Sequence, residues 1–268
     1  MMNKVLVSII FLLLWGCSTT QLESPRSIES CCQEQVGFDN LDYGEPMVCD
    51  FTTNRVGYAL GFVCAWRQPA WVAYRLTTNE ATTLSVRRTN KFKDDVGVPG
   101  SASLGDYLHS GYDRGHLAPA ADMGWSSLAM DESFFMSNMS PQTPSFNRGV
   151  WKELETHLRK YAASGNNIFI YTGPMFQERS FTNSIGKSSV LVPTAFYKAV
   201  YNENPTNEAM IAFLVPNVGT TNSISTFALT IDELEGILNM DFFKDIPIEK
   251  QDELESKLEL DRWGLKNK

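Results

Sequence analysis

From Tyr112 to Glu155 the chain reads YDRGHLAPAADMGWSSLAMDESFFMSNMSPQTPSFNRGVWKELE. Three short blocks stand out in this stretch: DRGH at 113–116, SNMSPQ at 137–142 and NRGVWKELE at 147–155. His116 follows a glycine and precedes a run of small residues, a setting that lets an imidazole stand clear in a cleft. Histidine is also the only side chain whose ordinary pKa makes it a ready base near neutral pH. His116 is therefore the candidate base of a catalytic site.

The three blocks together resemble the DNA/RNA non-specific endonuclease family with the ββα-metal active site, the group that includes the Serratia-type nucleases and endonuclease G. DRGH alone is a four-residue match, whereas three blocks in the right order within 43 residues are far more specific. Flanking similarity, from WVAY at 71–74 through YTGP at 171–174, extends the resemblance over most of residues 40–260. It implies a sequence-nonspecific endonuclease that cleaves DNA or RNA with a divalent metal ion, Mg²⁺ with Mn²⁺ as a substitute.

The resemblance also implies roles for individual side chains. It makes His116 the general base, Asn147 the direct metal ligand and Glu155 the carboxylate that binds and orients the waters around the metal. The residue chemistry agrees, because a neutral amide oxygen is a hard ligand that suits Mg²⁺. Glu155 lies eight residues after Asn147, about two helical turns along, and can share a face with it. Asn147 is also placed to cap the predicted helix, and the two roles can coexist.

Arginine and amide side chains complete the implied site. The resemblance points Arg114 at the scissile phosphate, where a planar guanidinium matches two oxygens at once; a structural salt bridge with Asp113 is the alternative. Asn138 is interpreted as a catalytic-site residue that supports the others. For a further phosphate-binding arginine upstream we choose Arg88, with Arg87 as the next choice, from a short stretch that carries four cations.

Three other titratable residues near these blocks are given no catalytic role. His109 and His157 are interpreted as ordinary surface or core residues. Glu153 falls on a different face of the predicted helix from Glu155, so we expect it to be solvated.

Composition permits this interpretation without proving it. Of the 268 residues, 43% are hydrophobic and 20% charged, which is enough apolar material for a sizeable core and too little charge for a disordered chain. The formal net charge of −8 argues mildly against nucleic-acid binding, because Lys and Arg supply most of the affinity for phosphate backbones. Net charge is a whole-surface average, however, and an enzyme needs only a local basic groove.

The N-terminus predicts export. Lys4 precedes an apolar run, residues 5–15, that is too short to span a bilayer comfortably and has the form of a signal-peptide core. The sequence LWGC at 14–17 resembles the bacterial lipoprotein box, which would make Cys17 a lipid-modified membrane anchor. Ser18 after this cysteine favours the outer membrane. An ordinary secretory signal or a simple N-terminal anchor are the alternatives, and all predict an exported protein of the periplasm or outer membrane.

Four cysteines remain beyond Cys17, and an even number in an oxidising compartment favours disulfides. Adjacent Cys31 and Cys32 are poorly placed to bond to each other. We therefore predict that Cys49 and Cys64 each bond to one member of that pair. The alternative for Cys64, which lies in an apolar run, is a free thiol.

Hydrophobic periodicity predicts an α+β fold with a mixed β-sheet core and flanking helices, and the family resemblance implies a ββα-metal active-site motif. The predicted domains are a lipoprotein-type signal peptide at 1–17, a flexible tether at 18–37 and a nuclease domain at 38–268. Apolar or alternating runs predict strands, an amphipathic run and a Thr cap predict helices, and polar residues predict a long loop. In chain order these are strands at 48–52, 56–63 and 71–76, a loop at 87–107, a helix at 151–163, strands at 167–172, 190–201 and 210–215, and a helix after Thr230.

Two other functions remain open beside the secreted endonuclease. One is a catalytically silent nucleic-acid-binding relative, which the intact set of His116, Asn147, Glu155 and Arg114 argues against. The other is a nucleotide phosphodiesterase or pyrophosphatase on the same fold, because the groove around the site sets the length of the substrate. The preference for DNA or RNA and the oligomeric state stay open.

Overall fold

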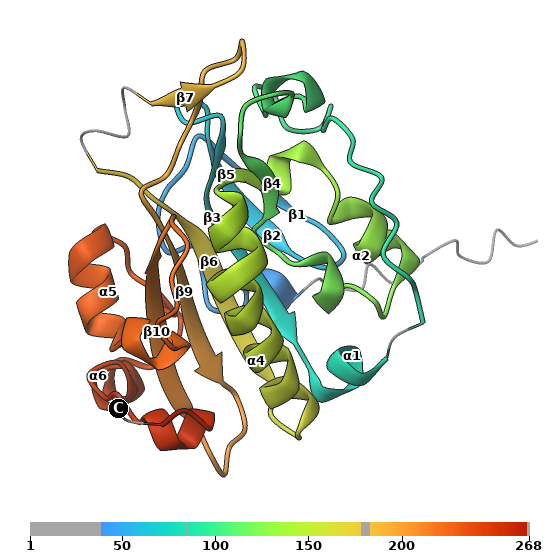
Figure 1. Cartoon of the computed structure of the whole chain (residues 1–268). Helices are drawn as coiled ribbons and strands as arrows, with labels where there is room; N and C mark the ends of the chain where they lie inside the picture. The colour runs from blue at the N-terminus through green and yellow to red at the C-terminus, as the bar shows by residue number, and fades with distance from the viewer. Residues whose placement is uncertain (1–38, 84, 178–182, 267–268) are drawn as a thin grey trace, which may run out of the picture. The chain divides into compact units, whose positions relative to one another are not determined.

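A seven-stranded antiparallel β-sheet organises the protein in the computed structural model, which describes residues 39–83, 85–177 and 183–266 (Figure 1). Its strand order is β1-β2-β3-β6-β9-β10-β11. The strands are β1 (Phe51–Asn54), β2 (Ala59–Val63), β3 (Gln68–Leu76), β6 (Ile168–Met175), β9 (Ala195–Asn202), β10 (Ala209–Pro216) and β11 (Ala228–Leu229). Two small two-stranded sheets flank it: β4 (Asp113–His116) with β5 (Met139–Gln142), and β7 (Ser184–Ile185) with β8 (Val190–Leu191).

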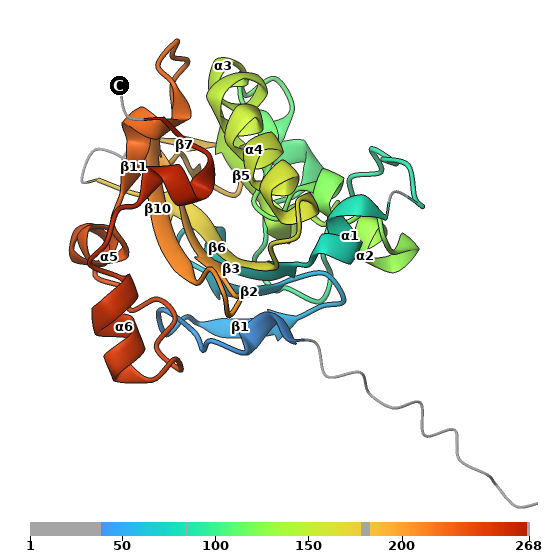
Figure 2. The same cartoon turned by 90° about the horizontal axis from the view of Figure 1, so that it is seen from below.

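The central sheet is covered on both faces, as the two perpendicular views show (Figures 1 and 2). Side chains alternate between the faces of a strand, and here both sets are apolar. In β6, for example, Ile168 and Ile170 enter one hydrophobic core while Phe169 and Tyr171 enter another. The inner strands β2, β6, β9 and β10 therefore read as largely apolar runs, because both faces of the sheet are covered there.

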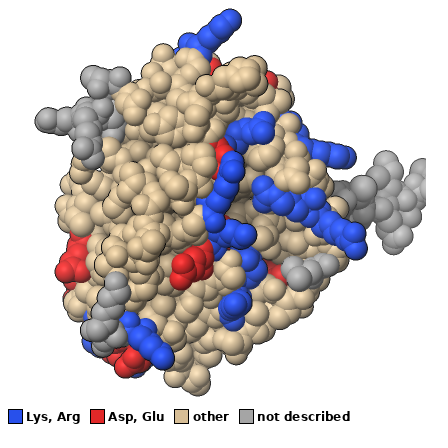
Figure 3. Space-filling view, viewed as in Figure 1, with Lys and Arg blue, Asp and Glu red and all other residues tan. Residues whose placement is uncertain are grey.

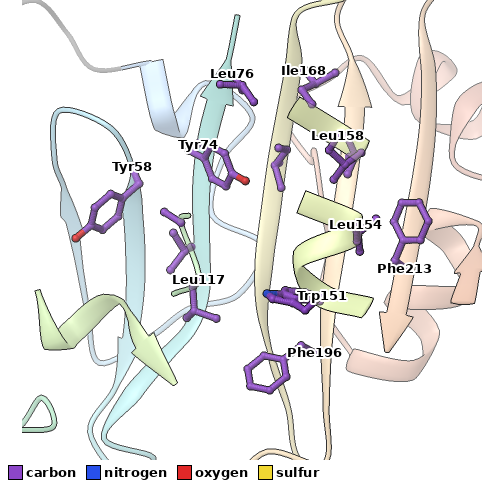
Figure 4. Packing of buried hydrophobic residues seen from close by; sticks show 14 of the residues in the cluster. Tyr58, Tyr74, Leu76, Leu117, Trp151, Leu154, Leu158, Ile168, Phe196 and Phe213 are labelled. Carbon is purple, nitrogen blue, oxygen red and sulfur yellow. The ribbon is translucent and has the colours of Figure 1, made fainter. Parts of the chain in front are cut away.

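Helix α4 (Lys152–Ala163) covers one of these faces, which we call the site face. Leu154, Leu158 and Ala162 recur every four residues and are fully or almost fully buried against the sheet (Figure 4). Full burial of one such leucine contributes about 1.5–3 kcal/mol. This packing fixes the rotation of α4, and so the direction of its remaining side chains.

Helices α5 (Ile231–Leu238) and α6 (Ile248–Leu254) lie on the opposite face, which we call the far face. Ile231, Leu234 and Leu254 pack there with the aromatic rings of Phe242 and Phe243. The predicted Thr230 cap is confirmed: Thr230 and Glu233 form a reciprocal capping box at the start of α5.

The chain between β3 and β6 holds the elements that carry the three sequence blocks. This connection contains α1 (Thr78–Thr82), β4, α2 (Ser127–Glu132), β5, α3 (Pro144–Phe146), a π-helical turn (Asn147–Trp151) and α4. In β4 and β5, Gly115 faces Ser140 and His116 faces Met139. The β4–β5 hairpin and α4 together form the expected ββα motif.

The structure confirms the α+β class and corrects several details. All strand pairings of the central sheet are antiparallel rather than mixed. β1 begins three residues later than predicted, and the predicted 190–201 strand is split into β8 and β9 around Pro193, which has no N–H for a ladder. Hydrophobic periodicity did not predict α1, α2, β4, β5 or α6, which are all short.

The predicted signal peptide, the tether and Cys31 and Cys32 lie outside the described residues. Within residues 39–266, apart from the undescribed positions, no helix combines the length and apolarity needed to cross a membrane.

Candidate active site

A pocket of about 410 Å³ opens on the site face, between the β4–β5 hairpin and α4. Figure 3 shows Lys and Arg side chains gathered around a hollow on this face. The pocket is lined by Arg88, Arg114, His116, Pro119, Ala120, Ala121, Asn147, Arg148, Lys152, Glu155, Thr156 and Arg159. Five of the six side chains assigned to the site from the sequence, those at 88, 114, 116, 147 and 155, therefore meet in one pocket.

His116 ends strand β4 and forms part of the pocket wall with only 8% of its surface exposed. Its ring packs edge-on against Phe134, with the centroids 5.0 Å apart, and against Phe92 at 5.4 Å. Its Nε2 atom is buried and has no hydrogen-bond partner among the described residues. Burial, and then the positive charges of Arg88 and Arg114, lower the pKa of His116 to about 3. The imidazole is therefore neutral at physiological pH and can accept a proton.

Close contact between the two hairpin strands explains the glycine of the DRGH block. A Cβ atom on Gly115 would lie 2.1 Å from the side chain of Gln142 on β5. The buried Gln142 side chain occupies the space that a Cβ at position 115 would need, and the register of the hairpin sets the position of His116.

Asn138 does not line the pocket. Its side chain is completely buried, and its amide donates to the carbonyls of Ala118 and Ser133 and accepts from the Ala118 N–H at 2.9 Å. Asn138 thus holds the segment that follows His116, which agrees with a supporting position rather than with contact to a substrate.

Asn147 begins the π-helical turn, where Gly149 has a non-helical conformation, and its orientation is fixed by Asp113. The Asn147 Nδ2 atom donates to Asp113 Oδ2 at 2.8 Å, and Arg148 donates to both oxygens of the same carboxylate. Burial acts to raise the pKa of Asp113, but these hydrogen bonds and the charge of Arg148 hold it below its ordinary value. An ionised carboxylate only accepts hydrogen bonds. The amide nitrogen must therefore face Asp113, which leaves the amide oxygen for another partner.

Glu155 projects from α4 into the pocket, and Lys198 of β9 influences it from the sheet below. Lys198 is completely buried, with its Nζ atom 4.6 Å from the centre of the Trp151 ring and 3.3 Å from the Thr172 hydroxyl. Burial raises the pKa of Glu155, and the positive charge of Lys198 opposes this shift. A cation at the pocket would favour the ionised carboxylate in the same way.

The donor set fits a hard divalent cation. Asn147 offers an amide oxygen whose nitrogen is already engaged, and Glu155 offers a carboxylate with no ion pair among the described residues. Both are oxygen ligands, and Mg²⁺ typically takes only one or two protein ligands and keeps several of its waters.

The two arginines assigned to phosphate both reach the pocket. Arg114 stacks over Phe92 at 4.2 Å, and Asp113 forms its ion pair with Arg148 rather than with Arg114. Arg88 lines the pocket and Arg87 does not, which favours the first choice for the upstream arginine.

Three further cations line the pocket that were not assigned to the site from the sequence, namely Arg148, Lys152 and Arg159. Lys152 and Arg159 stand three residues before and four residues after Glu155, so helical spacing could have placed them on the same face. Arg159 also forms an ion pair with Asp122, which is itself buried.

The cysteine prediction is not tested by the described residues. Cys49 and Cys64 are free thiols within this part of the chain, and their predicted partners lie outside it. The predicted disulfides therefore stay predictions.

Comparisons with known proteins agree with this geometry. Residues 39–248 match the family model described as DNA/RNA non-specific endonuclease. Nuclease C1 of Cunninghamella echinulata var. echinulata is 31% identical over 223 residues, 78% of this chain and 88% of that protein. Mitochondrial endonuclease G of Homo sapiens is 32% identical over 206 residues, 72% of this chain and 69% of that protein. A solved structure of the EndoG/EndoGI complex, which addresses EndoG inhibition, is similar at a TM-score of 0.71 and 30% identity, covering 79% of this chain and 92% of that one.

Proposed function

Since the chain belongs to the DNA/RNA non-specific endonuclease family, we propose that it is an exported, Mg²⁺-dependent endonuclease that hydrolyses phosphodiester bonds in DNA or RNA without sequence preference. One observation carries the proposal: a neutral buried imidazole, an oriented amide oxygen, a carboxylate and several arginines line the same pocket. Phosphodiester hydrolysis requires a base for water, charge neutralisation on the phosphoryl oxygens and stabilisation of the departing oxygen.

Each side chain then has a defined task. His116 takes the proton from the attacking water, because its buried imidazole is neutral and can accept it. Arg114 and Arg88 neutralise charge that develops on the phosphoryl oxygens. When bound, Mg²⁺ acts as a Lewis acid that stabilises charge on the phosphate and the departing oxygen. Asn147 would hold that ion directly, and Glu155 would orient its waters.

Nonspecific cleavage agrees with the chemistry of the pocket wall. The cations around the hollow match the phosphate backbone, which is the same for every sequence. Contacts that position phosphates carry no sequence information, and the cation-rich pocket therefore favours a backbone-reading enzyme.

Supercoiled plasmid and structured RNA, incubated with the purified protein across a Mg²⁺ titration and in EDTA, test the proposal. We expect nicked and then linear plasmid with Mg²⁺ and no cleavage in EDTA. Cleavage of short nucleotides alone would instead identify the phosphodiesterase or pyrophosphatase, and binding without cleavage would identify the silent relative. Full activity in EDTA would exclude the proposed metal role.

Export and lipid anchoring at Cys17 are a separate part of the proposal, supported by the apolar run at 5–15 and the LWGC sequence that follows. Mass spectrometry of the mature N-terminus should find a lipid-modified Cys17. An unmodified N-terminus elsewhere would remove the anchor.

The disulfides from Cys49 and Cys64 to the Cys31/Cys32 pair also belong to this proposal, supported by the even number of cysteines beyond Cys17. Each would contribute about 2–4 kcal/mol. Peptide mapping under non-reducing conditions tests them, and four free thiols would contradict the pairing.

A further inference from the structure

Three carboxylates converge on the far face, on the opposite side of the sheet from the pocket. Asp232 and Glu235 lie one turn apart on α5, and Glu255 follows the last residue of α6. One carboxylate oxygen from each can be chosen so that all three lie within 4.8 Å of one another. The backbone N–H of Asp232 donates to the Glu255 carbonyl at 3.2 Å, so the main chain itself holds the two helices together here.

Glu255 is the unusual member of this cluster. Only 6% of its surface is exposed, and its Oε1 atom is buried with no hydrogen-bond partner among the described residues. Buried carboxylates elsewhere are compensated: Asp122 pairs with Arg159, and Asp95 pairs with Arg55. A buried polar oxygen without a partner is unfavourable, and a bound cation would satisfy this one.

No protein cation fills that place in the described part of the chain. Within it, Asp232, Glu235 and Glu255 form no ion pair with Lys or Arg; the basic residue nearby on α6, Lys250, pairs with Glu208 instead. The site thus combines three converging carboxylates with a buried oxygen that lacks a partner among the described residues.

We propose that Asp232, Glu235 and Glu255 bind a Ca²⁺ ion that joins α5 to the end of α6. The donors are all oxygens, the ligand type of hard cations. Three oxygens within 4.8 Å of one another can all lie within about 2.8 Å of a common point, close to the calcium–oxygen distances of about 2.3–2.6 Å. Ca²⁺ accepts several carboxylates in one flexible shell, whereas Mg²⁺ is usually held by one or two. Asp232 is exposed, which leaves room for the waters that complete the shell.

The experiment is thermal unfolding of the full chain carrying Asn147→Ala. This background lacks the proposed metal ligand of the pocket, so a change in melting temperature on adding metal reports on the acidic cluster. The melting temperature is measured at pH 8 in EDTA, in 10 mM CaCl₂ and in 10 mM MgCl₂. With an affinity of about 10⁻⁴–10⁻³ M, typical of extracellular calcium modules, Ca²⁺ should raise the melting temperature by about 3–10 °C. Mg²⁺ should raise it much less.

Glu255→Gln, added to this background, keeps the shape of the side chain and removes its charge, so it should abolish the calcium-dependent rise. Asp232→Asn should reduce the calcium-dependent rise in melting temperature. Asp232 is exposed, so this substitution should not disturb folding. Glu253→Gln is the matched control, because Glu253 lies on the same helix but is exposed and pairs with Lys257. Titration calorimetry should find one Ca²⁺ per chain, lost in Glu255→Gln.

The proposal would be overturned if Ca²⁺ did not raise the melting temperature of the Asn147→Ala background. It would also be overturned if Ca²⁺ raised the melting temperature equally after Glu255→Gln was added. In the chain with Asn147 intact, Glu255→Gln should still cleave plasmid with Mg²⁺, because the cluster and the pocket lie on opposite faces of the sheet. Failure of the calcium site and failure of the nuclease assignment are therefore distinguishable.

Discussion

The two faces of the central sheet are built from the same strands yet carry opposite charge. The site face gathers cations around its pocket, namely Arg88, Arg114, Arg148, Lys152 and Arg159. The far face gathers carboxylates that influence one another, namely Asp232, Glu235, Asp241, Asp252 and Glu255. A net charge of −8 is the sum of these unlike surfaces and says little about either. The negative net charge is therefore no argument against nucleic-acid binding at the pocket, where the cations are gathered.

The faces also differ in how their charges are compensated. On the site face Asp113 pairs with Arg148 and Asp122 with Arg159, so these carboxylates hold cations in position. On the far face the acidic trio has no such partners among the described residues. The positive charge on the site face suits the binding of a polyanion, whereas the uncompensated carboxylates on the far face suit the binding of a small cation.

The largest expected effect comes from His116→Ala. Removal of a positioned base typically costs about 10²–10⁴-fold in rate. Plasmid cleavage at saturating Mg²⁺ should fall by that factor, while nucleic-acid binding in a mobility-shift assay stays near the parent value. His109→Ala, an exposed histidine that does not line the main pocket, is the control. Near-normal cleavage by His116→Ala would remove the proposed base.

Asp113→Ala tests the fixed orientation of Asn147. Without this acceptor the amide can rotate, so activity at limiting Mg²⁺ should fall by roughly 10–100-fold and recover in part with excess metal. Arg148→Ala removes the other partner of Asp113 but leaves the Asn147 hydrogen bond, and should raise the Mg²⁺ requirement much less. Equal metal dependence in the two variants would show that Asp113 acts only through its ion pair with Arg148.

On the far face, Glu255→Gln should change how stability depends on pH. The pKa of Glu255 is raised from 4.5 to about 8, so the folded chain holds this proton more tightly than the unfolded chain does. The resulting stabilisation is complete below pH 4.5 and is lost as the pH rises through 8. The negative neighbours are Asp232, Glu235, Asp241 and Asp252.

The variant should therefore be more stable than the parent at pH 9 in EDTA and no more stable at pH 4.5. Solvent screens part of the repulsion, so we expect about 1–2 kcal/mol. Urea unfolding at both pH values, in EDTA, measures the difference. A parent whose stability does not fall between pH 5 and pH 9 would contradict it.

The smallest expected effect is on nucleic-acid affinity, and it compares a lysine on the site face with a lysine on the far face. Lys152→Ala, on the pocket, should weaken binding by roughly three- to tenfold and reduce the slope of log K against log salt by about 0.7–0.9. Lys250→Ala, on the far face and paired with Glu208, should change neither. Both are measured by fluorescence anisotropy in the His116→Ala background. Equal losses would mean that charge acts over the whole surface.

Strong periodicity made the scaffold largely predictable from sequence. Strands β3, β6 and β10 and helix α4 were placed within a few residues, because each buries a regular apolar pattern. β4 and β5 were missed because DRGH and MSPQ carry no such pattern. Their pairing depends on Gly115 fitting against Gln142, which is a tertiary contact.

Most side chains of the candidate site could be predicted from the sequence, whereas the contacts that the fold makes between distant residues could not. The hydrogen bond from Asn147 to Asp113 spans 34 residues. Lys198 acts on Glu155 electrostatically from β9, a strand with no polar motif of its own. Glu255 meets α5 only through the packing of α6, so no spacing in the sequence indicates the acidic cluster.

The long connection between β3 and β6 has a consequence for the folding pathway. Val72 pairs with Thr172 at the centre of the sheet, so this ladder closes a loop of about a hundred residues. Closing so long a loop costs conformational entropy before the strand pairing contributes any stabilisation. We therefore expect this ladder to form late in folding. The hairpin and α4, all inside that loop, have no complete sheet to pack against until the ladder forms. Catalytic competence should therefore appear with the last cooperative step, and a partly folded chain should be inert toward nucleic acid.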